Sequence, residues 1–199
     1  MKNVIFVHGR PSRRESFIIK SLGLKHSTLS WAGWLGKQLR KNGYEFNAPE
    51  MPRAYDPKWP VWVKEVEKFE LGPETTLVGH STGAGFWVRY LSEHPNLEVG
   101  KVILVAPWLG YDYGAPPTDF FEGYEIDPGI AKRTKGLVIF YSDNDFDAIK
   151  KSIAKLKSTL KNAKYREFRG YGHFTLKRMG MITRKFPELL EECLKTGVK

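Results

Sequence analysis

The chain lacks the features of a disulfide-stabilised or membrane-spanning protein. Its 199 residues include one cysteine, Cys193, so an internal disulfide cannot form, and a reducing compartment is favoured. The apolar run after Asn3 ends at His8, which is too short for a signal-peptide core or a membrane span. We therefore expect a cytoplasmic protein with no membrane span.

Motifs for nucleotide or nucleic-acid binding are also missing. There is no Gly-x-Gly-x-x-Gly run, no Gly-Lys-Ser/Thr loop, no zinc-finger spacing and no RNP-like aromatic motif. The net charge is +10, but the lysines of residues 150–164 alternate with Ile153, Leu156 and Leu160 at helical spacing. This pattern is typical of a solvated helix face, so a nucleic-acid partner is not expected.

What the chain does contain is a regular alternation of strand and helix patterns. Neither an internal repeat nor a linker interrupts it, so we expect one domain over residues 1–199. Alternation of this kind predicts a mostly parallel sheet with helices on both faces, a three-layer α/β/α sandwich. The predicted strands lie in residues 3–9, 44–52 (where the strand leads into a proline-marked loop), 75–81, 101–107, 136–142 and 164–170. The predicted helices cover 30–42, 60–71, 83–94, a segment from about 148, and 182–195.

One connection is longer than the others. Residues 108–134 lie between two predicted strands and are rich in proline, glycine and aromatic residues. Long connections are often functional. The aromatic part, from Trp108 to Tyr124, is expected to form a wall of the substrate pocket, and a satellite patch of core is the alternative.

The most informative stretch is Gly79-His80-Ser81-Thr82-Gly83, which follows a predicted strand and opens a predicted helix. In a parallel sheet, catalytic groups gather beyond the carboxyl ends of strands. A sharp strand-to-helix turn strains its central residue, and flanking glycines provide room for it. Ser81 is therefore a candidate nucleophile, and the N–H of Thr82 a candidate oxyanion donor.

A serine nucleophile needs a base oriented by an acid, and on this kind of fold they follow the serine in the order acid, then histidine. Of the five histidines, only His173 follows Ser81 after further strands, at the carboxyl end of the last one, where Gly170 and Gly172 suit a loop that folds back to the serine. The acid is expected after residues 136–142, where Asp143, Asp145 and Asp147 are all candidates. One of them could instead cap the next helix.

The second oxyanion donor is expected in the loop after the first strand. Pro11 has no N–H and is excluded. The amide of Arg10 is the favoured candidate, with Gly9 as the alternative.

Several motifs together resemble a known family. The segments VIFVHG, LVGHSTGA, VILVAPW, SDND and GYGHF are similar to those of small serine hydrolases of the α/β-hydrolase superfamily, the group that contains the retinoblastoma-binding serine hydrolase and YdeN-like proteins. The resemblance implies an α/β-hydrolase fold without a large cap and a Ser-Asp-His triad. Its pattern after the strand selects Asp145 as the acid, with Asp143 as the alternative.

These observations predict a serine hydrolase that cleaves a carboxylic ester or related acyl compound with Ser81, His173 and Asp145. No metal or organic cofactor is expected, and the partner is a small acyl substrate. Two alternatives remain: an amide or peptide hydrolase, and a catalytically weak scaffold that binds a protein partner. For the basic stretch after Gly9, with Arg10, Arg13 and Arg14, the favoured interpretation is exposed arginines without a specific role, and attraction of acidic substrates is the alternative.

Overall fold

The computed structural model describes residues 2–112, 118–175 and 185–195, and within them six strands form one sheet in which all neighbouring pairs run parallel. The strand order is β2-β1-β3-β4-β5-β6. The chain leaves β1 for β2 on one side and then crosses to β3 on the other, so the carboxyl ends of β1 and β3 flank the crevice in which such sheets bind ligands. The strands are β1 (Asn3–Val7), β2 (Glu45–Asn47), β3 (Thr75–His80), β4 (Val99–Val105), β5 (Thr134–Ser142) and β6 (Lys164–Phe168).

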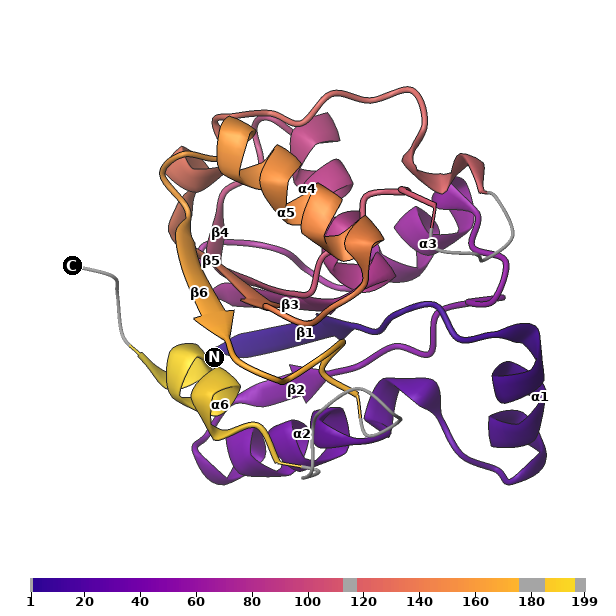
Figure 1. The fold of residues 1–199 in the computed structure, drawn as a ribbon. Coiled ribbons are helices and arrows are strands. Elements are labelled where there is room, and N and C mark those ends of the chain that lie inside the picture. The colour runs from indigo at the N-terminus through magenta and orange to yellow at the C-terminus, as the bar shows by residue number, and fades with distance from the viewer. Residues whose placement is uncertain (1, 113–117, 176–184, 196–199) are drawn as a thin grey trace.

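Helices cover both faces of this sheet. All seven residues of β4 are buried, as expected for a continuous apolar strand in the middle layer. Figure 1 shows α3, α4 and α5 on one face and α2 and α6 on the other, which confirms the predicted three-layer sandwich. These helices are α2 (Trp31–Lys41), α3 (Trp59–Val66), α4 (Thr82–Glu93), α5 (Asp147–Thr159) and α6 (Pro187–Leu194).

The helices differ in how they are buried. Thr82 to Leu91 of α4 are all buried, whereas α5 buries one stripe and exposes its lysines, as the sequence predicts. The stretch between β1 and α2 contains a further helix, α1 (Arg13–Ser21), which sequence patterning did not predict. Short 3₁₀ turns occupy His26–Thr28, Asp119–Phe121 and Ile130–Arg133. In the described ranges, no helix is both long and apolar enough to cross a membrane.

Part of the long connection after β4 packs on the protein core. Phe120 is completely buried, and its ring lies 4.9 Å from that of Trp62 and 5.6 Å from that of Trp59 (centroid distances). The Arg89 guanidinium donates a hydrogen bond of 2.6 Å to the Phe120 carbonyl. The alternative interpretation of this segment as a satellite of the core therefore applies to Phe120. Residues 113–117 of the connection lie outside the described residues.

Candidate active site

Ser81 occupies the tight turn between β3 and α4. Its backbone has φ 54° and ψ −118°, in the left-handed region that a non-glycine residue rarely adopts. The two flanking glycines are required by close backbone contacts. A Cβ on Gly83 would lie 2.1 Å from the Val7 carbonyl oxygen, and one on Gly79 would lie 2.5 Å from that of Gly83. The glycines thus allow α4 to pack directly on the ends of β1 and β3.

Backbone hydrogen bonds hold this turn against β4. The Ser81 N–H donates to the Val105 carbonyl at 2.9 Å, and the Ser81 carbonyl accepts the Trp108 N–H at 3.1 Å. Thr82 is the first residue of α4, so its N–H has no acceptor within the helix. The positive end of the helix is therefore directed to the region beside the Ser81 hydroxyl.

His173 lies in the loop that follows β6, and left-handed residues shape this loop. Gly170 and Gly172 have φ values of 75° and 52°, as expected for a chain that turns back toward β3. Two ring N–H groups donate hydrogen bonds to main-chain carbonyls of this loop. The His80 Nε2 donates to the His173 carbonyl at 2.9 Å, and the Trp31 Nε1 donates to the Phe174 carbonyl at 2.9 Å.

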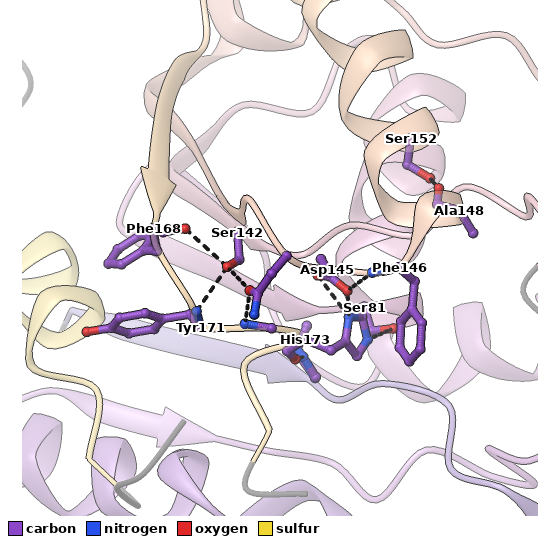
Figure 2. Close-up of polar contacts among 12 residues, drawn as sticks. Ser81, Ser142, Asp145, Phe146, Ala148, Ser152, Phe168, Tyr171 and His173 are labelled. Carbon is purple, nitrogen blue, oxygen red and sulfur yellow. Dashed lines mark hydrogen bonds and ion pairs between the residues drawn. The ribbon is translucent and has the colours of Figure 1, made fainter. Parts of the chain in front are cut away.

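The side chains of Ser81, His173 and Asp145 form one hydrogen-bonded chain (Figure 2). Ser81 Oγ lies 2.9 Å from His173 Nε2, and His173 Nδ1 lies 2.9 Å and 3.1 Å from the two Asp145 carboxylate oxygens. The Asp145 side chain is completely buried. Since a carboxylate only accepts, His173 Nδ1 carries the proton toward Asp145, and Nε2 faces the serine hydroxyl as an acceptor. The arrangement suits removal of the hydroxyl proton by His173.

The other acidic candidates have different partners. Asp143 accepts the Gly170 N–H at 2.8 Å, and this bond chiefly lowers the pKa of its carboxyl group. The neighbouring Asn144 Oδ1 accepts the Gly172 N–H at 2.8 Å. Asp147 begins α5 with a side chain that is 92% exposed. Asp143 and Asn144 therefore hold the loop that carries His173, while Asp145 contacts the imidazole itself.

Two more histidines, His8 and His80, lie next to the Ser81, His173 and Asp145 side chains, and their protonation follows from their burial and their hydrogen bonds. Burial lowers the pKa of His80 to about 3, with a further contribution from His173. Burial also lowers the pKa of His8 to about 4. His8 Nε2 accepts the Met51 N–H at 3.0 Å, so the proton of the neutral ring is on Nδ1, which donates to the Gly9 carbonyl at 2.8 Å. Both rings are therefore neutral at physiological pH.

The contact made by His8 orients the loop after β1. The Gly9 carbonyl and the Arg10 N–H belong to one planar trans peptide and point in opposite directions. With the carbonyl bound to His8, the N–H of Arg10 is fixed on the other side of that peptide. This loop passes very close to Ser81, because a Cβ on Gly9 would lie 3.0 Å from the Ser81 Cβ. The Arg10 side chain donates from Nε to the Tyr55 carbonyl at 3.0 Å.

A cavity of about 930 Å³ contains Ser81 and His173 in its wall. Of the expected aromatic wall from Trp108 to Tyr124, only Trp108 lines this cavity among the described residues, and Phe121 and Tyr124 line a separate cavity of about 380 Å³. For the rest of the described segment that expectation was therefore wrong, because Phe120 is buried in the core and Tyr111, Phe121 and Tyr124 line the separate cavity. The other walls carry histidines (His8, His26, His80), apolar groups (Phe6, Leu29, Trp31, Phe146, Ile149, Phe174) and charged groups (Arg10, Arg13, Glu15, Arg53, Asp56).

The structure brings together Ser81, His173 and Asp145, with Thr82 and the Arg10 loop beside them. The sequence did not predict the contacts of His80 and His8, although the His8-Gly9 pair at the end of a predicted strand indicated the loop in which the His8 contact lies. Metal ligands are a separate matter: the described segments contain no group of three or more His, Cys, Asp or Glu side chains suited to hold a metal ion.

The parallel sheet, the turn at Ser81 and the site at the strand ends define an α/β-hydrolase fold. The crystal structure of the Bacillus subtilis ydeN gene product superposes with a TM-score of 0.75, at 22% identity over 96% of each chain. Est1E of Butyrivibrio proteoclasticus, solved with ferulic acid bound, has a TM-score of 0.59 at 14% identity, over 97% of this chain and 86% of Est1E.

The sequence comparison defines the family. The serine hydrolase family model matches residues 19–179, and the chain belongs to this family. The YdeN protein of Bacillus subtilis (strain 168) is 33% identical over 84 residues, which are 40% of this chain and 44% of YdeN. The matched sequence therefore spans less than half of that relative. The family resemblance and the fold predicted from the sequence are confirmed.

Proposed function

We propose that this hydrolase cleaves carboxylic esters or related acyl compounds through a Ser81–His173–Asp145 triad. The observation that supports the proposal most directly is the continuous hydrogen-bonded chain from Ser81 Oγ through His173 to the buried Asp145 carboxylate. Ser81, at one end of this series of hydrogen bonds, lies in the cavity wall, where a substrate carbonyl has access to its hydroxyl. We further propose that residues 1–199 form one domain and that the protein is cytoplasmic, in line with its single, buried Cys193.

In this mechanism the Ser81 oxygen attacks the carbonyl carbon while His173 Nε2 takes the hydroxyl proton. The resulting imidazolium is stabilised by the Asp145 carboxylate. The tetrahedral intermediate collapses to an acyl-serine, and His173 returns the proton to the departing alcohol. A water molecule then attacks the acyl group, gives its proton to His173, and releases the carboxylic acid and free Ser81.

We assign the stabilisation of the negatively charged oxygen of the intermediate to hydrogen bonds from the N–H groups of Thr82 and Arg10. Thr82 supports this role because it begins α4, and its N–H is directed by the helix. Arg10 supports it because the bond from His8 to the Gly9 carbonyl fixes the same peptide. The rest of the cavity wall includes Trp31 and Ile149, which suits an acyl group with a substantial apolar part.

Labelling with a fluorophosphonate probe tests the triad. We expect wild type to react at one residue, Ser81→Ala to be unlabelled, and His173→Ala to be labelled at least about a thousandfold more slowly. Asp145→Asn should slow labelling strongly, because the amide stabilises the wrong tautomer of His173. Asp143→Asn is the matched control and should retain most of the rate. A labelled Ser81→Ala protein contradicts the proposal, and a larger effect of Asp143→Asn moves the acid role to that residue.

Substrate assays separate the alternatives. Turnover of short p-nitrophenyl esters without cleavage of aminopeptidase substrates supports the ester assignment, and the reverse result supports amide hydrolysis. If folded wild type shows neither turnover nor labelling, the protein acts as a binding scaffold and the enzymatic proposal fails.

A further inference from the structure

Helix α1 exposes apolar side chains to solvent. Phe17 is 74% exposed, and none of the nine residues of the helix is buried. Ile18 (43%), Leu22 (65%) and Leu24 (50%) continue the exposed apolar surface just after Phe17. Figure 1 shows α1 at the edge of the molecule, away from the sheet. Grouped apolar side chains of this kind mark an interaction surface.

Basic residues surround Phe17 on the same side of the helix. Arg14 precedes it by three residues and Lys20 follows it by three, which places both next to Phe17 on the helix surface, while the guanidinium of Arg13 lies 5.9 Å from the Tyr55 ring centroid, at the cavity. All of them are exposed. The acidic residue of this helix, Glu15, is on another side, where it accepts the Ser12 N–H at 3.0 Å in a capping box. The outward face of α1 (Arg14, Phe17, Lys20) therefore carries only positive charge around an aromatic ring.

This face lies beside the entrance of the catalytic cavity. The chain passes from the Gly9–Arg10 peptide to α1 within a few residues, and Ser12, Arg13 and Glu15 all line the cavity. A partner bound to the outward face of α1 would thus lie next to the opening that leads to Ser81.

We propose that the outward face of α1 docks onto an anionic lipid surface, so that the cavity entrance lies against that surface. Cations around exposed apolar side chains are the pattern by which a helix binds in the plane of a charged membrane interface. A second copy of the chain does not suit this face, because it would bring like charges together. Delivery of ester lipids to Ser81 is a consequence that rests on the proposed function, but the docking does not.

Co-sedimentation of the full chain with vesicles tests the docking. We expect binding to vesicles of phosphatidylcholine and phosphatidylserine, little binding to phosphatidylcholine alone, and weaker binding as salt is raised. Reversing two charges in Arg14→Glu/Lys20→Glu should weaken the binding by at least about 25-fold, since each basic residue contributes about fivefold. Phe17→Ser/Leu22→Ser should weaken it by at least about tenfold.

The matched control is Lys151→Glu/Lys155→Glu, which reverses two exposed charges on α5 and leaves α1 intact. It should bind vesicles nearly as well as wild type. Equal losses from the α5 and α1 variants would mean that general positive charge is responsible, and would overturn the proposal. An absence of vesicle binding by wild type or equal binding to uncharged vesicles would also overturn it. So would a finding that α1 binds an acidic protein but not vesicles.

Circular dichroism of each variant excludes unfolding as the cause. Hydrolysis of a water-soluble short ester should be unchanged in the α1 variants, because Arg14, Phe17, Lys20 and Leu22 do not line the cavity. Vesicle binding without ester turnover would refute the proposed function and leave the docking intact. Ester turnover without vesicle binding would do the opposite.

Discussion

The ring of His80 donates a hydrogen bond from Nε2 to the main-chain carbonyl of His173 at 2.9 Å, so the residue before the candidate nucleophile holds the backbone of the candidate base. The two rings also contact each other, with centroids 5.0 Å apart. Because burial keeps His80 neutral, it supplies a hydrogen bond without placing a second positive charge beside the His173 imidazolium.

Replacement of His80 by phenylalanine should lower kcat by about tenfold and leave KM nearly unchanged, because the His173 carbonyl loses its partner and the base loses its position. His80→Gln should recover most of the loss, since the glutamine amide carries an N–H at a similar place. Steady-state kinetics on a soluble ester measure both. If the two variants are equally impaired, the hydrogen bond is not the reason for the effect.

His8 offers a parallel test at the loop after β1. His8→Phe removes the donor to the Gly9 carbonyl and should lower kcat by about tenfold or more, because the Arg10 N–H, the proposed second oxyanion donor, loses its fixed orientation. His8→Asn places an amide N–H near the former Nδ1 and should keep more of the activity. Both variants lose the acceptor for the Met51 N–H, so the comparison isolates the Gly9 contact. Equal activity of the two variants would argue against a positioning role for His8.

Acid should destabilise the protein through the same two histidines. Their pKa values fall from 6.5 to about 4 for His8 and about 3 for His80, so the unfolded chain binds protons that the folded chain does not. Their contribution to stability is complete above the unfolded value and declines as the pH falls below it. Between about pH 6.5 and pH 5, wild type should lose about 3 kcal/mol more unfolding free energy than His8→Asn/His80→Gln. Urea titrations at each pH provide this comparison, and parallel slopes for both proteins would refute it.

The glycines of the Ser81 turn should tolerate no side chain. Gly83→Ala would force a Cβ against the Val7 carbonyl oxygen and should lower the unfolding free energy by about 3 kcal/mol. Gly72→Ala is the matched control, because its Cβ would meet no atom within 4 Å. Thermal unfolding by circular dichroism measures both. A stable, active Gly83→Ala protein would show that α4 has room to move away from β1.

Much of the fold followed from the sequence because its elements are decided locally. Buried strands such as β4 are continuous apolar runs, and Gly79-His80-Ser81-Thr82-Gly83 marks the turn without knowledge of its neighbours. By contrast, the edge strand β2 has only three residues, and the sequence of 44–52, where a strand was expected to lead into a loop, does not show where pairing with β1 ends. The final helix begins at Pro187 in the structure, and residues 182–184 of its predicted range lie outside the described residues.

Helix α1 was missed although Ser12 and Glu15 form a recognisable capping box. Its apolar residues face solvent, so the periodicity that marks a buried helix face is absent. The acid was ambiguous for a different reason. Asp143, Asp145 and Asp147 have similar local sequence, and what separates them is contact with a loop about 28 residues away along the chain. Only the tertiary structure contains that information.

Asp143 and Asn144 accept hydrogen bonds from Gly170 and Gly172, so the loop that carries Asp145 is bonded directly to the loop that carries His173. Ser81 is bonded through its main chain to Val105 and Trp108, at the end of β4. The β4–β5 ladder, the hydrogen bond from Leu109 to Ser152 and the bridge from His80 connect these two regions. The spacing between acid and base therefore depends on contacts between two loops, whereas the spacing between base and serine also depends on how β3, β4, β5 and β6 pair.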